Sequence, residues 1–429
     1  MIRRPSPYRR GARVLGDPLR RRLRAALYRP INPRVSVAGC WIPQLDETKH
    51  FKMIGSTGTG KTTAIHELLA AALERGDRAV IADPDGGYFR RLQRRYRPDT
   101  TLNPFERGSV RWDPFAEIRH EYDVDQLASA LIPHSEDPST REWRAYARTL
   151  FAAVVRICGA PNGTGLARLW ELLTVATADE LRPLVAGTPA QPFLEPDNAR
   201  MLGSIRSVLM SAIAALAHIR LQRARGFSVR EWVRSGRGVL FIPYRADQIA
   251  TLRSVIAAWL RLAIIEALSQ PENQDQRLWF VIDELDAIGA IDGLRDALAR
   301  LRKFGGRCVL GFQSIAQVSS TYGAGDAQTI VENCGTTLIL RCSSSENGGT
   351  AQFASRLIGE REVSRRQVSR SSDHERVWSL PGGRRSVQVS NQLAIESALM
   401  PSEIEQLPDL TGYLKLASSP VWRRIRLRR

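Results

Sequence analysis

Residues 55–62 read Gly-Ser-Thr-Gly-Thr-Gly-Lys-Thr and fit the pattern G-x-x-x-x-G-K-[ST] at every fixed position. The short apolar run Phe51–Ile54 precedes them, and residues 62–73 have the apolar spacing of a helix. A glycine-rich turn between a strand and a helix lets backbone N–H groups surround a phosphate at the helix N-terminus. The pattern therefore predicts a phosphate cradle rather than a glycine-rich turn with an incidental lysine.

The last residues of the pattern predict the chemistry of this cradle. Lys61 is one of only five lysines beside 57 arginines, and we expect it to bridge the β- and γ-phosphates during catalysis. The Thr62 hydroxyl is expected to ligate Mg²⁺. ATP and Mg²⁺ are the expected cofactors. The nucleotide-binding residues are predicted to be Gly55, Ser56, Thr57, Gly58, Thr59, Gly60, Lys61, Thr62 and Thr63.

Two carboxylates follow a second apolar run, Leu278–Ile282. A buried strand that ends in Asp283-Glu284 places both acids at the sheet edge where ligands bind. We expect Asp283 to hold Mg²⁺ through water and Glu284 to act as the general base on the attacking water. The alternative is that Glu284 only favours the N-terminus of the next helix.

Several polar residues at strand or helix ends are weaker candidates. Gln313 follows the run 308–312 and would sense the γ-phosphate, unless it is simply a polar strand end. Arg302 could act in trans as an arginine finger on a neighbouring nucleotide, or could complement the dipole of its own helix. Arg341 is a second candidate finger. Asp83 would orient water or Mg²⁺, or would only form an Asp-Pro turn.

The order of apolar runs predicts an α/β fold. Strands are expected at 51–54, 79–82, 239–242, 278–282, 308–312 and 337–340, with helices between them, including 252–268, 291–302, 327–334 and 350–358. Continuous apolar strands are typical of a mainly parallel sheet covered on both faces. Between these halves, residues 141–158 and 200–221 have amphipathic helical spacing. A polar hairpin-like stretch at 360–392 and a closing strand pair at 413–417 and 421–427 complete the pattern.

These patterns divide the chain of 429 residues into three parts. Residues 1–34 form a basic N-terminal arm with at most one short helix near 19–28. Residues 35–112 and 233–429 form the nucleotide-binding domain, and residues 113–232 form an inserted all-α domain.

The positive charge of the chain is concentrated in its tails. Residues 1–34 carry a net charge of +10 and residues 421–429 carry +5, out of +18 in total. Such tails suit nucleic acid or an anionic lipid surface, although a solvated terminus has the same composition. No apolar run is long enough for a membrane-spanning helix, and no apolar region follows the N-terminal arginines as it would in a secretory signal. Five scattered cysteines disfavour a disulfide scaffold or a zinc site and suit a reducing cytosol.

Together these motifs resemble the type IV secretion coupling proteins of conjugation (TraD-type), over residues 35–420. The resemblance is carried by residues 51–62, Asp83-Pro-Asp-Gly86, residues 280–285, Arg302-Lys303, Gly311-Phe-Gln-Ser314 and residues 400–413. It implies a RecA-like P-loop ATPase core of the FtsK/HerA type and a homo-hexameric ring. It also implies single- or double-stranded DNA, a relaxase and type IV secretion channel components as partners. The function implied is an ATP-driven DNA translocase that delivers relaxase-bound single-stranded DNA to the channel, with the all-α domain at the ring's cytoplasmic mouth.

The resemblance has one departure, because such proteins usually begin with transmembrane helices and this sequence begins with the basic arm. We therefore expect a cytoplasmic location, with peripheral attachment to the inner membrane through a partner or through anionic lipid, or a soluble variant. Two other functions fit the same motifs. One is a different FtsK/HerA-type DNA pump for genome packaging or resection, and the other is a non-motor module that ATP switches between nucleic-acid-binding states.

Overall fold

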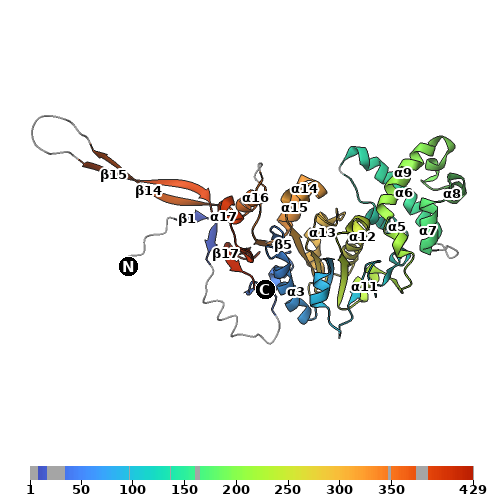
Figure 1. Ribbon diagram of the computed structural model, residues 1–429, viewed down its shortest axis with the longest axis horizontal. Helices are drawn as coiled ribbons and strands as arrows, with labels where there is room; N and C mark the ends of the chain where they lie inside the picture. Colours follow the sequence, from blue (N-terminus) through green and yellow to red (C-terminus); the bar gives the residue numbers. More distant parts are fainter. Residues whose placement is uncertain are drawn as a thin grey trace, which may run out of the picture.

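A ten-stranded β-sheet crosses the middle of the molecule in the computed structural model (Figure 1). The structure describes residues 8–16, 34–95, 97–135, 137–159, 165–345, 349–372 and 385–428. Seven neighbouring strands of the sheet are parallel. In spatial order they are β13 (Thr336–Ile339), β5 (Phe51–Ile54), β12 (Gly306–Phe312), β11 (Leu278–Ile282), β6 (Arg78–Pro84), β10 (Val239–Tyr244) and β7 (Thr100–Thr101).

Three further strands extend the sheet beyond β13. The strand β16 (Thr411–Lys415) is antiparallel to β13, and β17 (Val421–Arg426) is antiparallel to β16. The strand β2 (Arg13–Leu15) lies outermost and runs parallel to β17. The C-terminal strands of the described chain are thus separated by β13 alone from β5, the strand that leads into the phosphate loop.

Both faces of the sheet are buried in apolar cores. In β11, Trp279 and Val281 belong to one core, whereas Leu278, Phe280 and Ile282 belong to the other. This alternation explains why the strand reads as one continuous apolar run, since each face has its own helical layer. The predicted α/β class with a mainly parallel sheet is confirmed.

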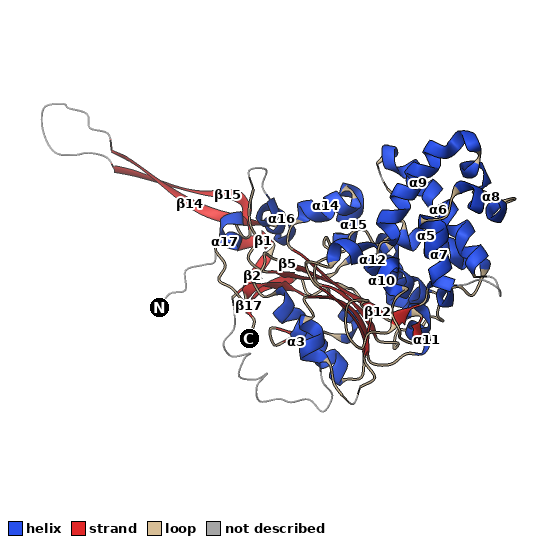
Figure 2. Ribbon diagram, turned by 45° about the vertical axis from the view of Figure 1, so that its right-hand side comes forward, coloured by secondary structure: helices blue, strands red, loops and turns tan. Residues whose placement is uncertain are grey.

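Helices cover both faces (Figure 2). One face packs against α3 (Lys61–Glu74) and α4 (Gly87–Leu92), which contribute Leu68, Leu69 and Tyr88 to its core. The other face packs against helices that follow later in the chain. These are α12 (Ile249–Leu268), α13 (Leu294–Leu301), α14 (Ile315–Tyr322), α15 (Ala324–Asn333), α16 (Gly349–Ile358) and α17 (Pro401–Glu405).

A group of helices lies at one end of the molecule (Figure 1). In the sequence these helices fall between β8 (Arg111–Trp112) and β10. The described regular elements of this segment are helices apart from β9 (Gly226–Phe227), which pairs with β8 and holds the two ends of the segment together. Apolar stripes such as Leu150, Phe151 and Val154 of α6 continue the core of the adjacent sheet face. The α-helices are α5 (Glu121–Leu131), α6 (Pro138–Cys158), α7 (Gly165–Thr174), α8 (Ala178–Val185), α9 (Ala199–Ile213), α10 (Leu216–Ile219) and α11 (Val229–Ser235).

A long ribbon projects from the opposite end of the molecule (Figure 1). It consists of β14 (Glu360–Ser372) and β15 (Arg385–Ser397), with β1 (Tyr8–Gly11) paired to the base of β14. Part of the predicted basic arm therefore forms strands, because β1 joins this ribbon and β2 joins the main sheet. The helix predicted near 19–28 lies outside the described residues. The short hairpin of β3 (Ser36–Val37) and β4 (Cys40–Trp41) and the helix α2 (Gln44–Glu47) precede β5.

Two predicted helices differ from those observed, and one observed helix was not predicted. The helix predicted at 291–302 begins at Leu294, since Gly293 adopts φ +76° before it. The helix predicted at 200–221 is interrupted between α9 and α10. The helix α14 was not predicted from its short, weakly apolar sequence. Within the described residues, none of the helices combines the length and apolarity that crossing a membrane would require.

Candidate nucleotide-binding site

The loop between β5 and α3 is closely braced by the C-terminal strands. Gly60 caps α3 with φ +119°, and a Cβ there would lie 2.9 Å from the Leu410 side chain and 3.0 Å from that of Leu427. Glycine is required at this position because both the positive φ and the close approach exclude a side chain. The Leu410 N–H also donates to the Thr59 carbonyl at 2.9 Å. The curvature of the loop thus depends on residues from the far end of the described chain.

Lys61 lies inside this loop as the first residue of α3. Its Nζ donates to the Gly55 carbonyl at 2.6 Å and to the Ser56 carbonyl at 3.3 Å. Burial lowers the pKa of Lys61, and the nearby Asp283 and Glu284 carboxylates oppose that shift. The ammonium group is therefore enclosed by the residues that are predicted to surround the phosphates.

Thr62 and Asp283 meet, although 221 positions separate them in the sequence. The Thr62 hydroxyl donates to Asp283 Oδ2 at 2.6 Å. The other oxygen, Oδ1, is buried without a hydrogen-bond partner among the described residues. A hydroxyl and an unpartnered carboxylate oxygen at the phosphate loop fit Mg²⁺, which binds proteins through few oxygen ligands and takes others from phosphate and water. Thr63 follows in the first turn of α3 and is half-buried.

Glu284, Gln313 and Thr57 form a hydrogen-bonded chain at the same sheet edge. The Gln313 amide donates to Glu284 Oε1 at 3.1 Å, and its carbonyl oxygen accepts from the Thr57 hydroxyl at 2.7 Å. Burial raises the pKa of Glu284, and the charge of Asp283 adds to the shift. The next helix begins only at Leu294, so Glu284 does not lie in its first turn as the alternative interpretation required.

Asp83 does not face the phosphate loop. Its two carboxylate oxygens accept the backbone N–H groups of Tyr88 at 2.9 Å and of Phe89 at 2.7 Å. These bonds hold the first turn of α4. Burial raises the pKa of Asp83 to about 6 despite these bonds. Of the two roles considered from the sequence, the structural one accounts for both oxygens.

The two candidate arginine fingers lie at opposite edges of the sheet. Arg302 is exposed just before β12 begins, whereas the phosphate loop lies beyond the end of that strand. Seven extended residues separate these edges by about 20 Å, so Arg302 is not brought to the site within its own subunit. Arg341 lies beside the loop, because its carbonyl accepts from the Ser56 N–H at 2.8 Å. Its guanidinium group pairs with Asp409 at 2.7 Å.

Three residues at this sheet edge were not predicted from the sequence. Tyr88 donates to Asp283 Oδ2 at 2.8 Å. Tyr244 Oη and Asp286 Oδ1 are buried without a hydrogen-bond partner among the described residues. Such atoms usually contact water or an ion. Tyr244 ends the apolar run of β10, and that position at a parallel strand's carboxyl end was the signal available from the sequence.

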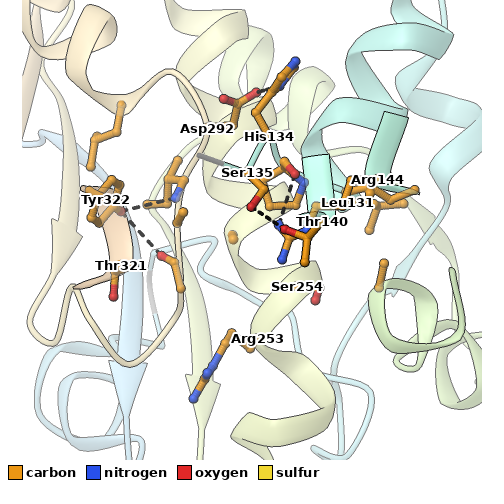
Figure 3. Close-up of a pocket in the computed structure, with 18 of the residues that line it drawn as sticks. Leu131, His134, Ser135, Thr140, Arg144, Arg253, Ser254, Asp292, Thr321 and Tyr322 are labelled. Carbon is orange, nitrogen blue, oxygen red and sulfur yellow. Dashed lines mark hydrogen bonds and ion pairs between the residues drawn. The ribbon is translucent and has the colours of Figure 1, made fainter. Parts of the chain in front are cut away.

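A separate cleft of about 970 Å³ lies between the inserted helices and the core (Figure 3). His134, Ser135 and Thr140 line one side, whereas Arg253 of α12 and Tyr322 of α14 line others. The hydroxyls of Ser135 and Thr140 are 2.7 Å apart. None of the residues predicted to bind phosphate or metal lines this cleft, but Asp286 of the same sheet edge does. The candidate nucleotide site and the interdomain cleft therefore adjoin at Asp286.

Comparisons with known proteins agree on one family. Residues 34–428 match the family model described as type IV secretion-system coupling protein DNA-binding domain. Coupling protein TraD of Escherichia coli (strain K12) is 32% identical over 381 residues, which cover 86% of this chain and 51% of TraD. The chain spans about half the length of the curated relatives that it matches best.

The solved structures give the same result. The unbound bacterial conjugative coupling protein TrwBdeltaN70 has a TM-score of 0.83 and 31% identity, covering 98% of this chain and 93% of that one. Plasmid coupling protein TrwB in complex with ADP and Mg²⁺ also has a TM-score of 0.83 and 31% identity, covering 98% of this chain and 94% of the other. Because the family model covers nearly the whole described chain, from residue 34 to residue 428, this protein belongs to the type IV secretion-system coupling protein family.

Proposed function

We propose that this chain is the ATP-hydrolysing DNA motor of a conjugative coupling protein. The observation that carries the proposal is the 2.6 Å hydrogen bond from Thr62 to Asp283. It joins the phosphate loop to the acidic end of β11, as a site for a metal-bound triphosphate requires. Solved structures of the related TrwB in complex with ADPNP and with ADP and Mg²⁺ support the same ligands here.

Each residue of the site has a role in this proposal. Lys61 exchanges its bonds to the loop carbonyls for phosphate oxygens, while the backbone N–H groups of residues 55–63 hold the phosphates. Glu284 accepts a proton from the attacking water as the water oxygen bonds to the γ-phosphorus and the bond to ADP breaks. Thr62 and Asp283 hold Mg²⁺, which neutralises the charge that develops on the phosphates.

Gln313 gives this site a way to report on its nucleotide. Its side chain contacts both Glu284 and Thr57, so a change in the phosphate loop alters the hydrogen bonding of the base directly. We infer that loss of the γ-phosphate is transmitted through Gln313 to β12 and α14. Residues of α14 and of the inserted helices both line the interdomain cleft. We expect the inserted helices to move when α14 moves.

The proposed assembly is a homo-hexameric ring whose neighbours share nucleotide sites. Arg302 is the proposed finger in this arrangement, since an exposed arginine about 20 Å from its own phosphate loop would meet a nucleotide only in another subunit. The substrate is single- or double-stranded DNA, delivered with a bound relaxase to the type IV secretion channel. The basic residues of segment 1–34 neutralise phosphates of this DNA or contact anionic lipid at the inner membrane.

The proposal is tested by steady-state ATP hydrolysis of the full chain with and without single-stranded DNA. We expect DNA to stimulate the wild type, and we expect Lys61→Ala and Glu284→Gln to abolish the stimulated rate. Glu284→Gln should still bind nucleotide, because it retains the loop and the metal ligands. Normal turnover by either variant would contradict the proposal.

A nucleotide switch without a motor gives a different result in the same assay. Such a module would bind DNA in a nucleotide-dependent way but would hydrolyse ATP at one low rate whether DNA is present or not. Displacement of a labelled strand or a bound protein from DNA, dependent on ATP, separates translocation from binding alone.

A further inference from the structure

The sequence Asp83-Pro-Asp-Gly-Gly-Tyr88 begins in the last two residues of β6, the strand that pairs with β11. The Asp83 carboxylate is occupied by α4, so the motif needs an explanation other than direct contact with metal or water. That explanation concerns its last residue. We propose that Tyr88 is a positioning residue that holds the Asp283 carboxylate in the orientation needed for Mg²⁺, an inference that rests on the proposed function.

The Tyr88 hydroxyl is aimed at the predicted metal ligand. Tyr88 is fully buried, and its Oη donates to Asp283 Oδ2 at 2.8 Å. An ionised carboxylate can only accept hydrogen bonds, so the Tyr88 phenol is the donor of this bond.

This donor determines which carboxylate oxygen faces which group. Oδ2 accepts hydrogen bonds from the hydroxyls of both Tyr88 and Thr62, whereas Oδ1 has no partner among the described residues. Because Thr62 donates its only hydroxyl proton to Asp283, the oxygen lone pairs of Thr62 remain free to ligate a cation. Rotation of the carboxylate would break both bonds together, so Tyr88 also stabilises the Thr62 orientation.

Tyr88 itself is held from two other elements. The Asp83 carboxylate accepts the Tyr88 backbone N–H at 2.9 Å, which fixes the start of α4. The His66 ring of α3 lies against the Tyr88 ring, with centroids 4.5 Å apart. Strand β6, through Asp83, and helix α3, through His66, therefore both hold Tyr88 in place at the start of α4.

The test measures how much Mg²⁺ strengthens nucleotide binding in the full-length Tyr88→Phe variant. Fluorescent methylanthraniloyl-ADP is titrated in the presence of MgCl₂ and, separately, of EDTA. Phenylalanine retains the ring and its contact with His66 and removes only the donor. We expect the Mg²⁺-dependent gain in affinity to fall about tenfold, the effect of losing one hydrogen bond to a charged group. The affinity in EDTA should stay within about twofold of the wild type.

Tyr322→Phe is the matched control. Tyr322 of α14 is a half-buried tyrosine that lines the interdomain cleft, and its hydroxyl accepts a hydrogen bond of 3.2 Å from the Ile291 N–H. Its Mg²⁺-dependent gain should equal that of the wild type. A combined Tyr88→Phe/Asp283→Asn variant should lose no more of this gain than Asp283→Asn alone, since the tyrosine acts through the carboxylate.

Three results would overturn the inference while leaving the proposed function intact. They are an unchanged Mg²⁺-dependent gain in Tyr88→Phe, an equal loss of affinity in MgCl₂ and EDTA, and additive losses in the double variant. A wild-type chain whose nucleotide affinity does not respond to Mg²⁺ would instead overturn the proposed function, and this inference with it.

Discussion

Gln313 donates its side-chain N–H to Glu284 at 3.1 Å, across the carboxyl ends of two neighbouring strands. The same carboxamide accepts from Thr57 in the phosphate loop. We expect Gln313→Ala to lower kcat for ATP by about ten- to a hundredfold, because the base loses a group that orients it. KM should change little, since Gln313 contacts neither the loop backbone nor Lys61.

The matched control for this variant is Gln317→Ala, an exposed glutamine one turn further along in α14. It should hydrolyse ATP at the wild-type rate. A rise in KM with unchanged kcat for Gln313→Ala would contradict the role assigned to this residue.

Gly311 permits the close approach of β12 and the acidic end of β11. A Cβ at this position would lie 2.2 Å from the Asp283 carbonyl oxygen and 2.9 Å from Asp283 Oδ1. Gly311→Ala should therefore lower the free energy of unfolding by about 1–3 kcal/mol and also weaken Mg²⁺-dependent nucleotide binding. Urea unfolding and the fluorescent ADP titration measure the two effects.

Gly325→Ala provides the comparison, because a Cβ at this position in α15 meets no atom within 4 Å. It should be neutral or stabilising by up to about 1 kcal/mol, as alanine favours helix over glycine. Equal stability of the two variants would show that the β11–β12 contact relaxes without cost.

His66 should make the protein less stable in mild acid. Burial, with Arg91 nearby, lowers its pKa to about 4, and its Nδ1 is buried without a partner among the described residues. Between about pH 6.5 and 4 the unfolded chain binds a proton that the folded chain excludes, so stability falls as the pH falls. His50, whose pKa burial also lowers to about 4, contributes in the same direction.

His66→Phe should keep the ring contact with Tyr88 and make this decline shallower, by at most about 1 kcal/mol per pH unit. Urea midpoints measured between pH 7.5 and 4.5 provide the comparison. A decline identical to that of the wild type would mean that His66 titrates normally in the folded protein.

The candidate site residues were easiest to predict where neighbours in the sequence form a recognisable pattern and their residue types match the expected chemistry. Lys61 and Thr62 lie in one contiguous pattern, and Asp283 follows a strand whose apolar residues leave little choice of structure. Tyr88 was missed because Asp83-Pro-Asp-Gly-Gly reads as a turn, and nothing local indicates that the next side chain reaches a residue 195 positions away. The start of α13 was misplaced because its apolar spacing extends back to Ile291, across Gly293, which adopts a positive φ and ends the helical geometry there. The pairing of β1 and β2 could not be predicted, since their partners lie at the other end of the chain.

Arg302 can be tested by mixing subunits. Rings assembled from wild-type and Arg302→Ala chains in varied ratios should lose ATPase activity faster than the fraction of variant rises, if one subunit's arginine acts on its neighbour's nucleotide. Lys303→Ala is the control, because it removes the adjacent exposed charge. A linear decline for Arg302→Ala would assign the arginine to its own helix.

The basic arm can be tested without disturbing β1 or β2. Replacing Arg20, Arg21, Arg22 and Arg24 by glutamine removes four charges between β2 and β3. The slope of log K for DNA binding against log salt should flatten by about 0.7–0.9 for each phosphate that the arm no longer neutralises. Arg168→Gln/Arg182→Gln, on the inserted helices, should leave the slope unchanged. An unaltered slope for the arm variant would indicate that the arm contacts lipid or serves as a linker and does not bind DNA.

The bracing of the phosphate loop by Leu410 and Leu427 has a consequence for biosynthesis. Strand β5 and its loop leave the ribosome early, yet their partners in the sheet and the residues that shape Gly60 are translated hundreds of codons later. A nascent chain therefore has the whole recognisable nucleotide motif long before it can hold a nucleotide. Nucleotide therefore cannot stabilise the early folding intermediates. Both edges of β5 remain unpaired until β12 and β13 have been synthesised, and an unpaired strand edge is prone to aggregation.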